Sequence, residues 1–176
     1  KEQEESASSK YVLCAVGRVP ATEGLFGEGV SLSMERGRVI VDEHFKTSMD
    51  GVYAIGDLIP GMQLAHLASA QGICLMEELA GEKRSIDLSV VPSCVYTSPE
   101  IASVGITEAI AKDKGIEIEV GKFMMSANGK SLISKEERGF VKILADKETK
   151  KVLGVQMMCA RATDMIGEFG NAVANG

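Results

Sequence analysis

The stretch "TSMDGVYAIGD", Thr47–Asp57, combines a turn, a short apolar segment and a carboxylate directly after a glycine. The pair Asp50-Gly51 is typical of a turn, and the apolar run Val52–Ile55 predicts a short strand buried on both faces. Ligands of open parallel sheets bind at the carboxyl ends of strands, where Gly56 has no side chain to block their approach. Asp57 is then placed to accept hydrogen bonds from the hydroxyl groups of a sugar or polyol.

A helix is predicted to follow this turn. In "QLAHLASAQGICLMEELAG" the apolar residues recur near helical spacing, which predicts a helix from about Gln63 that stops at Gly81. The N–H groups of its first turn lack intrahelical partners and lie at the positive end of the helix dipole. That end suits an electron-rich group such as the pyrimidine edge of a reduced flavin. Strand, turn and helix together make one βα unit.

Each candidate residue also has a purely structural interpretation. Asp57 can cap the turn or the start of the helix. His66 is better explained as a partly exposed helical histidine than as a catalytic base. Gly17 ends "YVLCAVG", Tyr11–Gly17, which is predicted to be another buried strand, and it either leaves room for a nucleotide or simply ends that strand. For Asp57 and Gly17 both interpretations stay open.

From about Val90 onward the pattern changes. Alternating segments such as "IEIEVGKFMMS" and "GFVKILADKETKKVLGVQMMC" predict antiparallel strands, Thr107 is a helix N-cap, and "ATDMIGEFGNAVAN" predicts a closing helix with Met165, Ile166, Phe169 and Val173 on one side. This half is therefore an α+β unit. Its "YTSPE" stretch offers a polar cluster that lines a site or is only structural: Tyr96, Thr97 and Glu100.

Composition excludes several classes of protein. The 176 residues are 45% hydrophobic and 25% charged, with a net charge of −6, so no basic surface for nucleic acid is expected. No run of 18 apolar residues occurs and the first ten residues are polar, which predicts no membrane span and a cytoplasmic protein. The cysteines form no C-x-x-C pair and are expected to be reduced core thiols: Cys14, Cys74, Cys94 and Cys159.

Chemistry-bearing motifs are scarce. No G-x-G-x-x-G, P-loop or H-E-x-x-H occurs, and the sequence has only two histidines, His44 and His66. The sequence therefore predicts neither a catalytic residue nor a metal site of its own.

Six segments in order carry a family resemblance: "YVLCAVGRVPATEGL", "VDEHFKTSMDGVYAIGD", "QLAHLASAQG", "VVPSCVYTSPEIASVG", "KFMMSANGKSLI" and "GFVKILADKETKKVLGVQ". The set resembles the dihydrolipoamide dehydrogenases, flavoproteins of the pyridine-nucleotide disulfide oxidoreductase family. "GVYAIGD" alone is less specific, since it also resembles ferredoxin reductases and NADH oxidases. The resemblance implies a homodimer with FAD, NAD and interface domains, in which NADH and lipoamide exchange electrons through the flavin and a redox-active cysteine pair.

The resemblance also implies roles for individual residues. Asp57 resembles the acid that binds the ribityl chain of FAD, and Gly17 resembles the glycine at the NAD site. The segment whose backbone N–H groups hold the pyrimidine side of the flavin, with glutamine where methionine is usual, corresponds to Gln63, Leu64, Ala65 and His66.

Domain boundaries follow from the same resemblance. Residues 1–18 would end the NAD-binding domain, 19–89 would be the C-terminal segment of the FAD-binding domain, and 90–176 would be the interface, or dimerisation, domain. The expected fold is thus α/β followed by an antiparallel α+β unit. The two G-x-G-x-x-G loops, the C-x-x-x-x-C disulfide and the final H-P-T segment of the family are missing. The chain is therefore expected to be an excerpt, inactive alone, with weak or no binding of FAD.

The expected function is part of an FAD-dependent dihydrolipoyl dehydrogenase with a role in cell redox homeostasis. Such an enzyme oxidises dihydrolipoamide with NAD⁺ and serves a lipoyl-bearing protein of a 2-oxoacid dehydrogenase or glycine cleavage complex. Two alternatives stay open. One is another flavin disulfide reductase, such as a mercuric or coenzyme A disulfide reductase, and the other is a catalytically inert dimerisation module.

Overall fold

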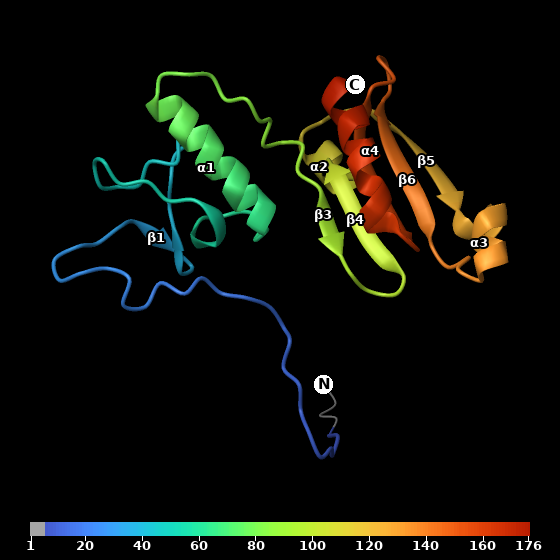
Figure 1. Cartoon of the computed structure of the whole chain (residues 1–176), viewed down its shortest axis with the longest axis horizontal. Coiled ribbons are helices and arrows are strands. Elements are labelled where there is room, and N and C mark those ends of the chain that lie inside the picture. The colour runs from blue at the N-terminus through green and yellow to red at the C-terminus, as the bar shows by residue number, and fades with distance from the viewer. Residues whose placement is uncertain (1–5) are drawn as a thin grey trace. The chain divides into compact units, whose positions relative to one another are not determined.

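The computed structural model describes residues 6–176, which form two compact units (Figure 1). The first unit runs up to Gly61 and the second begins at Met62. Among the described residues, no helix is both long and apolar enough to cross a membrane.

The first unit has little regular structure. Strands β1 (Met34–Glu35) and β2 (Arg38–Val39) form a small antiparallel hairpin, and the 3₁₀ turn η1 spans Gly56–Leu58. A single antiparallel bridge joins Lys46 to Tyr53. The buried side chains of this unit come from segments on both sides of that bridge: Val39, Phe45, Ala54 and Ile59.

The opening stretch folds back on the segment before it. The N–H of Thr47 donates to the carbonyl of Val52 (3.0 Å), and the N–H of Ala54 donates to the carbonyl of Phe45 (3.0 Å). The predicted turn at Asp50-Gly51 is confirmed, because the N–H of Val52 closes it on Met49 and Gly51 has a φ of 72°. A left-handed φ of this kind favours glycine.

Two predicted strands of a parallel sheet are wrong for this structure. Tyr11–Gly17 is extended but forms no strand, and its apolar side chains are open to solvent, with Leu13 90% and Val16 94% exposed. Val52–Ile55 contributes only the bridge at Tyr53. A buried strand needs neighbours for its backbone groups and covers for both faces. Among residues 6–61 the structure has only the strands β1 and β2, which pair with each other and not with these two segments.

The second unit begins with helix α1 (Ala65–Leu79). The predicted stop at Gly81 is confirmed: the N–H of Gly81 bonds the carbonyl of Glu78 (3.0 Å) and the N–H of Glu82 bonds that of Glu77 (2.8 Å). These two bonds are the Schellman pattern of a helix end. The prediction of a buried apolar face is only partly correct. Leu67 and Cys74 are buried, but three apolar residues of the helix are exposed: Ile73, Met76 and Leu79.

A five-stranded antiparallel sheet forms the rest of this unit, as the sequence predicts. Its strand order is β3–β4–β7–β6–β5. The strands are β3 (Ser93–Val95), β4 (Glu100–Gly105), β5 (Ile118–Met124), β6 (Phe140–Asp146) and β7 (Val152–Cys159). The shorter connecting elements are α2 (Glu108–Asp113), η2 (Met125–Ala127) and α3 (Gly129–Ser134).

Helix α4 (Ala162–Asn175) packs along β4 and β7 and covers one face of the sheet (Figure 1). Beneath it lies the main core: Ala102, Val104, Val155, Met157, Cys159, Ala162 and Ile166. Phe169 and Val173 pack against this core as predicted, but Met165 is 36% exposed. The predicted cap of α2 is confirmed, since the Thr107 hydroxyl accepts from the N–H of Ile110 (3.3 Å).

Candidate functional site

Asp57 lies in the 3₁₀ turn η1, directly after Gly56, which has a φ of 72°. No side chain caps η1 or the N-terminus of α1, so Asp57 plays neither of the capping roles that its position allows. Asp57 is exposed, and its carboxylate has no hydrogen bond or ion pair with any described residue. An exposed, unpaired carboxylate is available to accept hydrogen bonds from a ligand.

The N-terminus of α1 is likewise uncapped. Its N-cap residue is Leu64, which has no capping side chain, and the first helical bond runs from the N–H of Ala68 to the carbonyl of Leu64 (3.0 Å). The N–H groups of Ala65 to Leu67 therefore lack intrahelical acceptors, as at any helix start. With the helix dipole they form a donor set for an electron-rich ligand edge.

His66 has a structural contact of its own. Its Nε2 lies 2.7 Å from the carbonyl oxygen of Pro92, so Nε2 carries the proton and donates it. The side chain thus ties the first turn of α1 to the segment before β3. This contact fits the interpretation of His66 as a structural, exposed histidine.

Gly17 stands apart from these features. It is exposed, with a φ of 144°, and a Cβ added there would meet no atom within 4 Å. No cradle for a nucleotide surrounds it among the described residues. Gly17 and Asp57 belong to the first unit, whereas Gln63 to His66 belong to the second, and the structure describes each group within its own unit.

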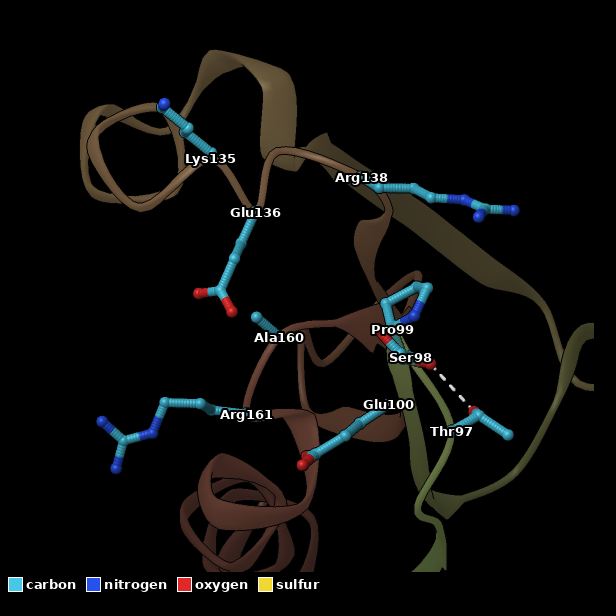
Figure 2. A pocket seen from close by; sticks show the side chains of 9 residues that line it. All are labelled: Thr97, Ser98, Pro99, Glu100, Lys135, Glu136, Arg138, Ala160 and Arg161. Atoms are coloured by element: carbon cyan, nitrogen blue, oxygen red, sulfur yellow. Dashed lines mark hydrogen bonds between the residues drawn. The ribbon is translucent and has the colours of Figure 1, made fainter.

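Glu100 has a role that sequence reasoning missed. Its Oε2 accepts a hydrogen bond from the backbone N–H of Thr163 (2.9 Å) and another from the hydroxyl of the same residue (2.7 Å). Thr163 is in the first turn of α4, so Glu100 caps that helix from strand β4. Thr97 and Glu100 also line a hollow of about 340 Å³, whereas Tyr96 is 81% exposed and does not line it (Figure 2).

The cysteines are all free thiols. Cys74 and Cys159 are buried and Cys94 is half-buried, as expected of core thiols, but Cys14 is exposed because the stretch around it is uncovered. Burial, with a smaller effect of the Glu100 charge, raises the pKa of the Cys94 and Cys159 thiols. A raised pKa keeps a thiol protonated and unreactive. Among the described residues, no group of three or more metal-ligating side chains occurs.

Residues 1–72 match the family model described as "Pyridine nucleotide-disulphide oxidoreductase", and residues 91–176 match the one described as its "dimerisation domain". The chain belongs to the pyridine nucleotide-disulphide oxidoreductase family, whose members are oxidoreductases that use FAD and a pyridine nucleotide. The five-stranded sheet and α4 lie wholly within the part matched to the dimerisation domain.

Two proteins similar to this chain are named dihydrolipoyl dehydrogenase, and one solved structure has a similar fold. The mitochondrial enzyme of Pisum sativum is 46% identical over 163 residues, 92% of this chain and 32% of that protein. The enzyme of Bacillus subtilis is 45% identical over 166 residues, 94% of this chain and 35% of that protein. The crystal structure of LpdA from Mycobacterium tuberculosis has a TM-score of 0.77 and 33% identity, covering 89% of this chain and 35% of that one. The chain spans about a third of the length of the curated relatives it matches.

Proposed function

We propose that this chain is part of an FAD-dependent dihydrolipoyl dehydrogenase that oxidises dihydrolipoamide with NAD⁺. The observation that carries the proposal is its similarity, over more than nine-tenths of its length, to proteins named dihydrolipoyl dehydrogenase. The enzyme would be a cytoplasmic homodimer that serves a lipoyl-bearing protein of a 2-oxoacid dehydrogenase or glycine cleavage complex. The match to a dimerisation domain supports the homodimer.

We assign the parts of the chain to three domains of that enzyme. Residues 1–18 end the NAD-binding domain, residues 19–89 belong to the FAD-binding domain, and residues 90–176 form the interface domain. The change from sparse structure to a continuous antiparallel sheet, which begins at β3, supports the last boundary.

The candidate residues fit a flavin nucleotide. FAD, when bound, carries electrons between the dithiol and NAD⁺. Asp57 would accept hydrogen bonds from the ribityl hydroxyls, since its carboxylate is exposed and unpaired. The uncapped N–H groups that follow Leu64 would donate to the pyrimidine edge and stabilise negative charge there. Gly17 would leave room at the NAD site.

The experiment that tests the Asp57 role uses the enzyme that carries this chain. Asp57→Ala is compared with Asp57→Asn, which keeps one acceptor oxygen, and with the control Asp50→Ala in the neighbouring turn. After extensive dialysis we expect Asp57→Ala to lose flavin, Asp57→Asn to lose less, and the control to keep it. Full flavin in Asp57→Ala would remove this residue from the site.

Substrate identity is tested separately. The purified enzyme should reduce NAD⁺ when dihydrolipoamide is supplied. An enzyme that does not oxidise dihydrolipoamide, but uses a reduced pyridine nucleotide to reduce mercuric ion or coenzyme A disulfide, would overturn the assignment in favour of another flavin disulfide reductase. A protein without flavin or activity would favour an inert dimerisation module.

A further inference from the structure

The turn that carries Asp57 is attached to the rest of the first unit on both of its sides. Before the turn, the N–H of Ala54 donates to the carbonyl of Phe45 (3.0 Å). After the turn, a side chain makes the attachment: Nη1 of Arg38 donates to the carbonyl oxygen of Ile59 at 3.0 Å. This second bond is part-buried and joins residues that are 21 positions apart in sequence. Asp57 therefore lies between two points at which the chain is tied to other segments of its unit.

Ile59 is the residue at which the turn η1 ends. Its N–H donates to the carbonyl of Gly56 (3.2 Å), and its side chain is buried, with only 5% exposed. A carbonyl beside buried apolar groups needs a donor. Among the described residues, the only hydrogen bond that the Ile59 carbonyl accepts comes from Arg38. Because the donor is a guanidinium, this bond is stronger than one between neutral groups.

Arg38 is itself well placed to hold the turn. It lies on strand β2, where it pairs with Glu35 across the hairpin, and the N–H of Ile40 extends the pairing by donating to the carbonyl of Ser33 (2.9 Å). The next residue, Val39, is 1% exposed and belongs to the core of the unit. The backbone of Arg38 is thus held on both sides, and its side chain can serve as a strut between the hairpin and the end of η1.

A second arginine of the hairpin provides a contrast. Arg36 and Arg38 both line a hollow of about 300 Å³, together with Pro60 and Gly61. Arg36 is exposed and makes no hydrogen bond or ion pair with any described residue. A cation that attracted an anionic ligand to this hollow would act similarly from either position. Only Arg38 bonds to the segment that carries Asp57.

We propose that Arg38 is a positioning residue for flavin binding, because its bond to the carbonyl of Ile59 holds the turn that presents the Asp57 carboxylate. This inference rests on the proposed function, in which Asp57 accepts hydrogen bonds from the ribityl hydroxyls. The Asp57 carboxylate has no partner among the described residues, so its position depends on the backbone that carries it. A ligand binds more tightly to an acceptor that is already in place than to one that must be ordered on binding.

The test measures the dissociation constant of FAD for the enzyme that carries this chain, after the flavin has been removed and titrated back. Arg38→Met keeps the apolar stem but has no donor, Arg38→Lys keeps a donor, and Arg36→Met is the matched control. We expect Arg38→Met to raise the dissociation constant about tenfold, because a charge-assisted hydrogen bond is lost. Arg38→Lys should raise it less, and Arg36→Met should leave it unchanged.

The same substitutions in an Asp57→Ala background separate positioning from a general loss of structure. If Arg38 acts through Asp57, Arg38→Met should weaken FAD binding in that background by less than about twofold. A general structural effect, or a direct contact of Arg38 with the cofactor, would give the same loss in both backgrounds and overturn the proposal. Equal losses in Arg38→Met and Arg36→Met would also overturn it, since both would then act through the charge of the hollow.

Circular dichroism and thermal unfolding of each apoenzyme check the fold. If Arg38→Met does not fold, Arg38→Lys replaces it in both backgrounds, and its expected loss of about threefold should vanish without the Asp57 carboxylate. Wild-type affinity for FAD in folded Arg38→Met, with weakened binding in Asp57→Ala, overturns the role of Arg38 alone. Wild-type affinity in Asp57→Ala refutes the proposed role of Asp57 and this inference with it.

Discussion

Glu100 joins two parts of the second unit that are 63 residues apart in sequence, because its carboxylate accepts two hydrogen bonds from Thr163. The N–H groups of a helix start need acceptors, and here the acceptor comes from a strand rather than from the residue before the helix. Arg161, which occupies the N-cap position of α4, makes no capping bond and has a left-handed φ of 59°. Glu100 therefore replaces the missing local cap.

We expect Glu100→Ala to lower the free energy of unfolding by about 1–2 kcal/mol, as the loss of a helix cap does in other proteins. Urea unfolding measures the change, and Glu168→Ala, an exposed position on the same helix, is the matched control. Glu100→Gln, which keeps an acceptor oxygen, should lower the free energy of unfolding by less than Glu100→Ala does. Equal stability of Glu100→Ala and wild type would mean that the cap contributes nothing.

Asp146 is a second residue whose carboxylate organises the backbone, at the turn between β6 and β7. Its Oδ1 accepts from the N–H of Thr149 (2.7 Å), the hydroxyl of Thr149 (2.9 Å) and the N–H of Glu148 (3.0 Å). The backbone bond from Thr149 is the main reason that the pKa of Asp146 lies below its usual 3.8. Because the folded pKa is the lower one, Asp146 stabilises the fold above pH 3.8, and this contribution is lost as the pH falls through the lowered value.

Asp146→Ala should therefore lower the urea midpoint near neutral pH, and the difference from wild type should shrink below pH 3.8. Urea titrations across the acid range give this difference directly. Glu137→Ala, at an exposed position in the loop before β6, serves as the control and should show no such trend. A difference that stays constant through the acid range would contradict the role of the ionised carboxylate.

At the scale of elements, glycines allow neighbouring backbone segments to approach strand β7 closely. A Cβ at Gly154 would overlap the carbonyl oxygen of Ile106, and one at Gly139 would overlap that of Met158. Gly121, on the edge strand β5, has open space instead. The sequence shows only that these positions are glycines, so the difference between them depends on what packs beside each one.

We expect Gly154→Ala to reduce the free energy of unfolding by about 3 kcal/mol or more, since backbone must move to admit the methyl group. Gly121→Ala should change it by no more than about 0.5 kcal/mol. Thermal or urea unfolding of both variants measures the contrast. Similar stabilities for the two variants would contradict this expectation, because they would mean that the backbone around Gly154 shifts to admit a methyl group at little cost in free energy.

At the scale of the whole molecule, the candidate flavin contacts are divided between two units. Asp57 belongs to the first unit and Gln63 to His66 belong to the second. Neither unit has a glycine-rich loop of the G-x-G-x-x-G kind, whose backbone N–H groups would hold the phosphates of a dinucleotide.

The 176-residue chain alone should therefore bind FAD weakly or not at all. Flavin fluorescence titration and the colour of the protein after gel filtration measure this. The enzyme that carries the chain is the positive control, and riboflavin, which has no phosphate group, shows whether the phosphates of FAD contribute to binding. A chain that stays yellow through gel filtration would contradict the expectation.

The sequence by itself determined much of the secondary structure of the second unit. Period-two alternation predicts its antiparallel strands, and local chemistry predicts the Thr107 cap and the Gly81 stop, because these signals depend on neighbours a few residues apart. The family resemblance of the ordered segments is also a property of the sequence, and the matches to the pyridine nucleotide-disulphide oxidoreductase family confirm it.

Only the tertiary structure decided which groups meet across long stretches of chain. It paired Glu100 with Thr163, tied His66 to Pro92, and left the Asp57 carboxylate unpaired. It also showed that Tyr11–Gly17 is exposed to solvent, although its apolar residues had predicted a buried strand. The physical reason is the same in each case: hydrogen-bond partners and the burial of apolar surface depend on what surrounds a residue in space, and local sequence does not specify those surroundings.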